Sequence, residues 1–409
     1  MEALILAALA AVVYWGLCTA RERQRGCPGG RGGTETAPAA EPAVSPESAG
    51  NTANEETTLP AGETEESVEV VVEPYADIRY FEDDPGSKEV YEAGTFREED
   101  IYTFTFNEGT VLEGSEELQA QIMEEGKNPG LGVRALHEQG ITGEGVRVAI
   151  IDQNLLLDHP EFAGKIEDYY DTGCDQPADS GSMHAPGVTS LLVGESIGVA
   201  PGATVYFAAA PSWNGDSAYY ADGLNWIVEQ NEKLPEGEKI RVVSVSAAPS
   251  GEWSPFTENL EMYDQAVEAA QAAGIVVLDC RTGEETGFIA SAFFDPTARE
   301  DPTACTGGWP SNPMTVSSSE IGVPCSYRTV AEEYWEGEIS YQYDGSGGLS
   351  WGIPYAAGVL ALGWQVAPEL DGETMLQLLK DSCATAHDGS RIIDPAAFIE
   401  AVREAHGQS

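Results

Sequence analysis

The chain has 409 residues, of which 42% are apolar, so it can form one large domain or two ordinary ones around a sizeable core. It carries 69 acidic and 20 basic residues, which gives a formal net charge of -49. A surface of this charge repels nucleic acid phosphates and anionic membranes, so both are excluded as electrostatic partners.

The amino-terminal region contains a continuous apolar run, ALILAALAAVVYWGLCTA at residues 3–20, which is just long enough to span a bilayer. We interpret residues 1–20 as a signal peptide or a membrane anchor, and we expect an exported protein of the cell envelope or the extracellular space. Arginines 21, 23 and 25 follow the run, and the positive-inside rule then favours a cytoplasmic carboxyl side. The orientation of a membrane tether is therefore left open.

Two further segments precede the main domain. Residues 21–62 are rich in Gly, Pro, Ala, Thr and Glu and poor in large apolar residues, a composition that predicts a disordered linker. Residues 63–127 form an acidic extension in which SVEVVVEPYADIRYFEDD and DIYTFTFNEGTVL alternate apolar and polar residues, which predicts strands. This extension is either a propeptide-like segment or a part that packs against the main domain.

The main domain is expected at residues 128–409, where short apolar runs alternate with helical stretches. The runs are VRVAII (146–151), TVYFAAA (204–210), IRVVSVSAA (240–248) and GIVVLDC (274–280). Apolar strands separated by helices predict an α/β fold with a parallel sheet that is buried on both faces. Functional residues of such sheets collect at the carboxyl ends of the strands.

The seven cysteines are dispersed and show no CxxC or Cys/His spacing, so we expect no structural zinc site and assign no metal ligands. A disulfide between Cys305 and Cys325 is one pairing that the order along the chain allows. The redox compartment is not determined by this pattern.

Two candidate catalytic residues stand out by position. Asp152 ends the apolar run VRVAII, where a carboxylate can be half-buried and directed at a partner on another element. Among only five histidines, His184 in GSMHAPGVTSLLVG opens a run of small and apolar residues that suits a closely packed helix. Taken alone, Asp152 is equally a turn or cap residue, and His184 is equally a satisfied core histidine.

The third candidate is Ser350 in GGLSWGIPYAAGVLALGW (347–364), where glycines precede one serine and a proline follows it in an apolar run. Pro354 has no N–H to donate to the carbonyl of residue 350, so we expect Ser350 in the first turn of a buried helix. Free amides and the helix dipole favour developing negative charge there, and a base could make the hydroxyl a nucleophile. A plain helix cap is the alternative on this stretch alone.

These three segments, in this order, resemble the Asp, His and Ser blocks of the subtilisin-like serine proteases. The resemblance covers about residues 128 to 405 and includes GVAPGA after the histidine block and RIIDPAAFIEAV near the end. It implies a three-layer fold with a mostly parallel central sheet flanked by helices.

The same resemblance implies a serine endopeptidase. Ser350 would attack the scissile carbonyl, His184 would transfer the proton and Asp152 would orient His184, in the order along the chain that is known for subtilisin itself. SVSAAPSGE resembles the strand of the family that lines the substrate cleft, which assigns substrate binding to Ser246, Ala247 and Ala248. The partner would be a peptide or protein substrate that binds as an added strand. No cofactor is expected; family members often bind calcium, but no calcium loop is recognisable.

Several positions depart from the family pattern. HGTH is replaced by HAPG, and GTSMASPH by GLSWGIPY, which puts Trp351 next to the serine. RTGEETGF replaces the turn that supplies the oxyanion asparagine, so Thr282 or Gly283 is left as the candidate donor. These departures favour, as the alternative function, an impaired subtilisin-like domain that binds peptides or proteins without cleaving them. An unrelated esterase is disfavoured because no GxSxG elbow surrounds Ser350.

Overall fold

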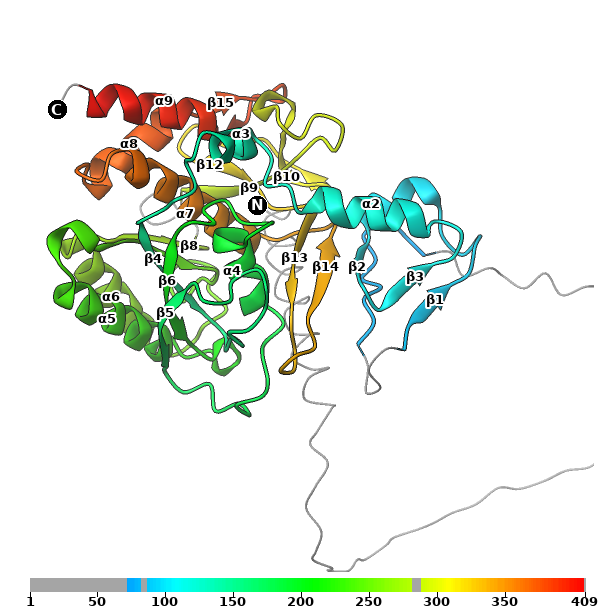
Figure 1. Ribbon diagram of the computed structural model, residues 1–409, viewed down its shortest axis with the longest axis horizontal. Coiled ribbons are helices and arrows are strands. Elements are labelled where there is room, and N and C mark those ends of the chain that lie inside the picture. Colours follow the sequence, from blue (N-terminus) through cyan, green and yellow to red (C-terminus); the bar gives the residue numbers. More distant parts are fainter. Residues whose placement is uncertain (1–71, 82–86, 282–287, 408–409) are drawn as a thin grey trace, which may run out of the picture. The chain divides into compact units, whose positions relative to one another are not determined.

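A computed structural model describes residues 72–81, 87–281 and 288–407 of the chain (Figure 1). All of them belong to one compact unit, Val71–Ser409. The proposed signal or anchor at 1–20, the linker at 21–62 and the first part of the acidic extension lie outside the described residues. Among the described residues, no helix combines the length and the apolar character that a membrane crossing requires.

The central sheet has five parallel strands in the order β5-β6-β4-β7-β8. Three of the four runs predicted as strands occupy β4, β6 and β7, and the fourth contains β8, so the prediction of a parallel sheet is confirmed. The bounds of the strands are β4 Arg147–Asp152, β5 Ile166–Asp171, β6 Thr204–Ala209, β7 Ile240–Val245 and β8 Val276–Asp279.

Side chains of β4 alternate between two cores, as the period of two in a strand requires. Val148 and Ile150 belong to the larger core, which includes residues of α4 (Ala185–Val193) and α7 (Leu349–Val366). Ala149 and Ile151 belong to the second core, shared with α5 (Ala218–Lys233) and α6 (Leu260–Ala272). Helices therefore cover both faces of the sheet, which makes a three-layer fold (Figure 1).

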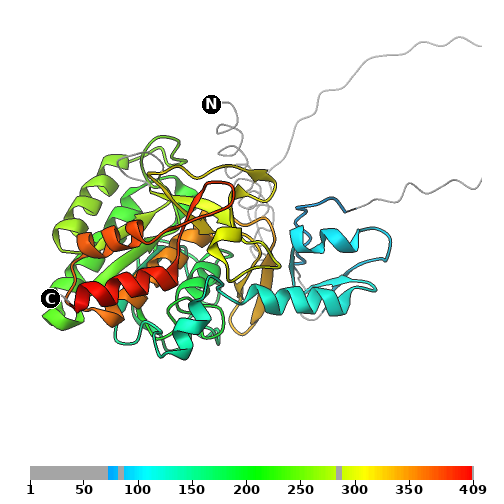
Figure 2. The same cartoon turned by 90° about the horizontal axis from the view of Figure 1, so that it is seen from above.

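Helix α7 is the central helix of the larger core. It packs against α4, β7, α8 (Gly372–Asp381) and α9 (Pro395–His406), as Figure 2 shows for the two carboxyl-terminal helices. Its apolar residues are buried almost all round, which explains why the sequence of this helix shows no polar face.

A second, mixed sheet has the strand order β11-β10-β9-β12-β16-β15. The bounds of its strands are β9 Ile289–Phe293, β10 Thr306–Trp309, β11 Asn312–Pro313, β12 Ile321–Pro324, β15 Ala384–Thr385 and β16 Arg391–Ile392. The remaining short helices are α3 Val133–Glu138, η2 Ser212–Asn214, η3 Glu236–Glu238 and η4 Pro302–Ala304.

The acidic extension is built into the same unit. Its strand β2 (Thr105–Asn107) pairs antiparallel with β14 (Ser340–Asp344), which pairs with β13 (Arg328–Glu332). Three of its aromatic and aliphatic side chains, Phe104, Phe106 and Ile122, are fully buried in the larger core. The other elements of the extension are β1 Glu89–Tyr91, η1 Glu98–Thr103, β3 Thr110–Leu112 and α2 Glu116–Gly126.

Two expectations about local structure are corrected. Residues 72–81 form no strand beyond an isolated bridge between Asp77 and Thr105, and DIYT is part of the 3-10 helix η1, because its acidic residues favour a helical first turn. Helix α2 was not predicted. The suggested disulfide between Cys305 and Cys325 does not form, since both cysteines are free and buried in the core.

Candidate active site

Asp152 and His184 form a hydrogen-bonded pair at the carboxyl end of the central sheet. Asp152 is the last residue of β4 and is 2% exposed. His184 is the residue before α4, and its Nδ1 lies 2.8 Å and 3.0 Å from the two carboxylate oxygens. Since Nδ1–H donates to the carboxylate, Nε2 is left free to act as an acceptor.

The electrostatics of the pair suit a proton carrier. Burial of the imidazole opposes its cationic form, but the charge of Asp152 and the hydrogen bond to it outweigh that effect, so the pKa of His184 is raised above its ordinary value. The carboxylate is itself held by the backbone N–H of Gln153, which donates to Oδ1 at 2.8 Å. A cation formed on His184 would therefore meet a fixed negative partner.

Ser350 is the second residue of α7, as the sequence predicted. Because Pro354 has no N–H, the carbonyl of Ser350 lacks its usual helical partner. The Oγ of Ser246 donates to that carbonyl instead, at 2.8 Å, and the Oγ of Ser350 donates back to the carbonyl of Ser246 at 3.2 Å. These two hydrogen bonds fix the start of α7 to the end of β7.

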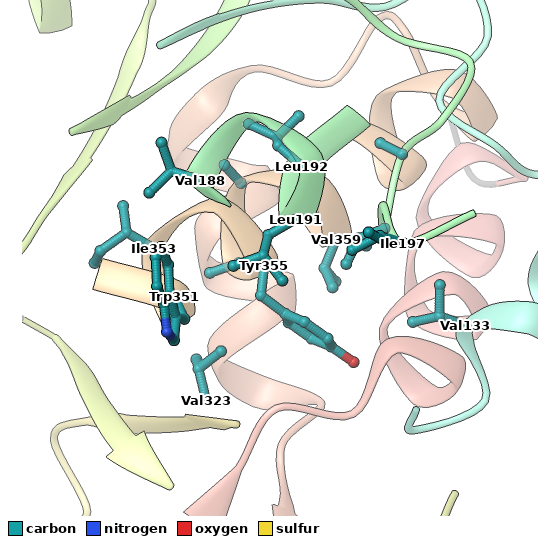
Figure 3. Close-up of a cluster of buried hydrophobic side chains, with 14 of the residues drawn as sticks. Val133, Val188, Leu191, Leu192, Ile197, Val323, Trp351, Ile353, Tyr355 and Val359 are labelled. Atoms are coloured by element: carbon teal, nitrogen blue, oxygen red, sulfur yellow. The ribbon is translucent and has the colours of Figure 1, made fainter. Parts of the chain in front are cut away.

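Ser350 directly precedes a residue that contacts the pair, but the described residues show no hydrogen bond from Ser350 itself to the pair. Among the hydrogen bonds of the described residues, the Ser350 hydroxyl is directed at Ser246 and not at His184. Trp351, the next residue, stacks on the His184 ring, and α4 packs on α7. Figure 3 shows Trp351 at the start of α7 in the same cluster of buried side chains as Val188 of α4. Catalytic hydrogen bonds are often loose in a protein without substrate.

Cys280 directly follows β8 and lies beside Ser350. Its thiol interacts with the Ser350 hydroxyl, and burial raises the pKa of the thiol well above its ordinary value. A thiol with a raised pKa stays protonated, so Cys280 contributes packing and not a second nucleophile.

The three predicted substrate-binding residues directly follow β7, at the same edge of the sheet. Ser246 is bonded to Ser350 as described, and the carbonyl of Ala247 accepts from the N–H of Cys280 at 2.9 Å. Ala247 and Ala248 are partly exposed. The segment therefore joins the serine to the end of β8.

The oxyanion donor is not defined by the described residues, because both candidates, Thr282 and Gly283, lie outside them. The neighbouring Arg281 is described. Its guanidinium donates to Asp279 at 2.7 Å and to Asp264 at 3.1 Å, and it lies over the ring of Tyr263. This side chain is thus held by partners on β8 and α6.

Sequence reasoning missed the group formed by Trp351, Asp344 and Gly187. The altered motifs HAPG, which contains Gly187, and GLSWGIPY, which contains Trp351, are visible in the sequence, but the contact between the two residues depends on how α4 and α7 pack. Among the described residues, no three His, Cys, Asp or Glu side chains gather to hold a metal ion. The calcium that the family resemblance allows for therefore has no group of acidic ligands among these residues.

The three-layer α/β fold, with the aspartate–histidine pair at the carboxyl edge of its parallel sheet, is the arrangement expected for the subtilisin-like class. The family model of the subtilases matches residues 143–395. The chain belongs to the subtilase family.

Individual relatives are distant. Subtilisin NAT of Bacillus subtilis subsp. natto is 25% identical over 236 residues, which cover 56% of this chain and 58% of that protein. Serine protease AprX of Bacillus subtilis (strain 168) is 26% identical over 310 residues, covering 66% of this chain and 68% of that protein. The solved structure of fervidolysin from Fervidobacterium pennivorans, a keratinolytic enzyme related to subtilisin, aligns at a TM-score of 0.48 and 17% identity, covering 68% of this chain and 47% of that one. The chain thus spans little more than half the length of subtilisin NAT.

Proposed function

We propose that this protein is a serine endopeptidase that hydrolyses peptide bonds through Asp152, His184 and Ser350. The observation that carries the proposal is the hydrogen-bonded pair of Asp152 and His184 beside the amino end of α7, which presents Ser350. Membership of the subtilase family supports it. The apolar run at residues 3–20 supports export or anchoring of the enzyme.

In the proposed reaction, a bound peptide turns the Ser350 hydroxyl from Ser246 towards Nε2 of His184. Oγ attacks the scissile carbonyl carbon while Nε2 takes its proton, and Asp152 holds the resulting imidazolium. His184 returns the proton to the leaving amine as the C–N bond breaks, which leaves an acyl-serine. Water, activated by the same imidazole, then hydrolyses the ester and restores Ser350.

The peptide would bind in extended form along Ser246, Ala247 and Ala248, pairing with this segment beyond the carboxyl end of β7. The hydrogen bond from the Ser350 hydroxyl to the Ser246 carbonyl supports this placement, because it sets the backbone of the segment beside the attacking oxygen. The oxyanion would be stabilised from the turn after β8, with Thr282 or Gly283 as the proposed donor.

A fluorophosphonate probe tests the nucleophile directly. Oγ of Ser350 would displace fluoride from phosphorus, and the intact mass would rise by one phosphonyl group. Labelling should vanish in Ser350→Ala and persist in Ser382→Ala, which removes a hydroxyl from the end of α8. If the folded wild-type protein stays unlabelled, or if Ser350→Ala is still labelled, the proposal is wrong.

The alternative is a subtilisin-like domain that binds peptides without cleaving them. The observation that favours it is the direction of the Ser350 hydroxyl, which is bonded to Ser246 and not to His184. The alternative would be supported if the wild type and Ser350→Ala bind a peptide with the same affinity and no member of a peptide library is cleaved.

A further inference from the structure

The indole of Trp351 lies nearly parallel to the imidazole of His184. The ring centroids are 5.3 Å apart and the planes differ by 20°. Trp351 is 7% exposed, so its ring is held inside the protein at the point where α7 begins. One side of the proposed base is therefore covered by an aromatic face.

The indole is held in this orientation by a buried carboxylate. Nε1–H of Trp351 donates to Oδ2 of Asp344 at 2.7 Å. The other oxygen, Oδ1, accepts from the hydroxyl of Thr105 at 2.9 Å and from the backbone N–H of Gly347 at 2.8 Å. Asp344 is 6% exposed, and its donors come from the acidic extension, from the loop before the serine and from α7.

The far edge of the indole rests on α4. An added Cβ at Gly187 would lie 2.8 Å and 2.9 Å from two ring carbons of Trp351, closer than real Cβ atoms approach. Gly187 and Trp351 are both departures from the family pattern, and here each accommodates the other. The indole is thus clamped between a carboxylate and a helix backbone.

We propose that Trp351 and Asp344 are positioning residues that hold the His184 imidazole in its working orientation and stabilise its cation. The inference rests on the proposed function, because it assigns a partner to the same base. Stacking restricts rotation of the imidazole, and the face of an indole attracts a cation. The hydrogen bond to the negative Asp344 places negative charge behind the indole, which favours an imidazolium on its face.

Two carboxylates act on His184 in this arrangement. Asp152, at the end of β4, bonds to Nδ1 directly, and Asp344, at the end of β14, acts through the indole. The neutral thiol of Cys280 faces Ser350 from the end of β8. Removing the indole leaves Asp152 in place, so the pair itself should survive.

The test compares Trp351→Leu, Trp351→Phe and Asp344→Asn with the wild type, using kcat and KM for a chromogenic peptide. Trp364→Phe is the matched control, since this buried tryptophan lies near the other end of α7 and donates to the carbonyl of Leu370 in the loop before α8. A cation on an indole face in a partly dry site is worth roughly a factor of 10. We expect Trp351→Leu to lower kcat about 10-fold at constant KM, and the phenyl ring of Trp351→Phe to restore most of it.

A double-mutant cycle tests the clamp. Gly187→Ala should lower kcat in the wild type, because its methyl group displaces the indole, but should have no further effect in Trp351→Leu. If the kcat losses of Gly187→Ala and Trp351→Leu simply multiply in the double variant, the clamp is contradicted. Wild-type kcat in Trp351→Leu, or an equal loss in Trp364→Phe, would overturn the inference.

The inference can fail separately from the proposed function. Nuclear magnetic resonance gives the pKa of His184 without turnover, with the signal assigned by its absence in His184→Gln. We expect Trp351→Leu to lower this pKa by about one unit, the equivalent of the 10-fold effect, and Trp364→Phe to leave it unchanged. If the wild type is unlabelled by the fluorophosphonate, the proposed function is wrong, and this titration still decides whether Trp351 acts on His184. An unchanged pKa in Trp351→Leu would refute that action.

Discussion

Glu333 carries a buried charge whose removal should stabilise the protein at alkaline pH. It follows β13 and is 1% exposed. Its Oε1 accepts from the N–H of Gly337 at 3.2 Å, whereas Oε2 has no hydrogen-bond partner among the described residues. Burial raises the pKa of Glu333 from 4.5 to about 7; the hydrogen bond from Gly337 opposes this rise, and the charge of Asp158 adds to it.

The raised pKa determines how stability depends on pH. The unfolded chain releases the Glu333 proton near pH 4.5, but the folded protein holds it until about pH 7. Folded protein therefore binds more protons between these values, and its stability falls as pH rises through this window. At 1.36 kcal/mol per pKa unit, the full cost above pH 7 is about 3 kcal/mol.

Glu333→Gln removes this cost, because the amide stays neutral throughout this pH window. Urea unfolding, followed by tryptophan fluorescence in a Ser350→Ala background to prevent self-digestion, gives the free energy of unfolding at pH 8 and pH 5. We expect Glu333→Gln to be more stable than its parent by about 3 kcal/mol at pH 8 and by little at pH 5. Glu338→Gln, an exposed neighbour, removes the same charge and should change neither value. An equal effect at both pH values, or a loss at pH 8, would refute the reasoning.

Two further predictions concern the pair and the extension. Asp152→Asn should lower kcat on a peptide substrate by about 10⁴, because an asparagine amide favours the wrong tautomer of His184. This is the loss known for the same change in the triad of a chymotrypsin-type protease. A loss below 10-fold would contradict the role assigned to Asp152. Phe106→Ala should cost about 3–5 kcal/mol in urea unfolding of the mature protein, because this fully buried ring stacks on Tyr343 of β14 at 5.1 Å. Unchanged stability would mean that the extension is removed on maturation.

The second of these predictions bears on maturation. We propose that residues 72–127 remain in the mature protein, because β2 supplies an edge strand to β14 and Thr105 bonds to Asp344. Removal of this segment would expose the core and leave the buried carboxylate of Asp344 short of a donor. Both interpretations of the extension allow contacts with the main domain, and the measurement of Phe106→Ala on the mature protein decides between them.

Much of the fold and the three candidate catalytic positions could be predicted from the sequence. Strands β4, β6 and β7 appear as apolar runs, since a strand buried on both faces has no polar side. Ser350 could be placed at a helix start because Pro354 restricts where the helix can begin. The short strands and 3-10 helix of the extension were harder, because acidic residues there obscure the alternation.

By itself, the sequence determined the parallel sheet and the helix start at Ser350, because apolar periodicity and proline geometry are local properties of the chain. The three candidate residues and their order came from its resemblance to the subtilisin-like proteases. Only the tertiary structure decided that Trp351 stacks on His184, that Gly187 makes room for it, and that Asp344 is shared with Thr105. These contacts join residues that are far apart along the chain, and they form only when α4, α7 and the β2–β14 pair are packed together. No local propensity encodes such a contact, since it depends on the relative placement of whole elements.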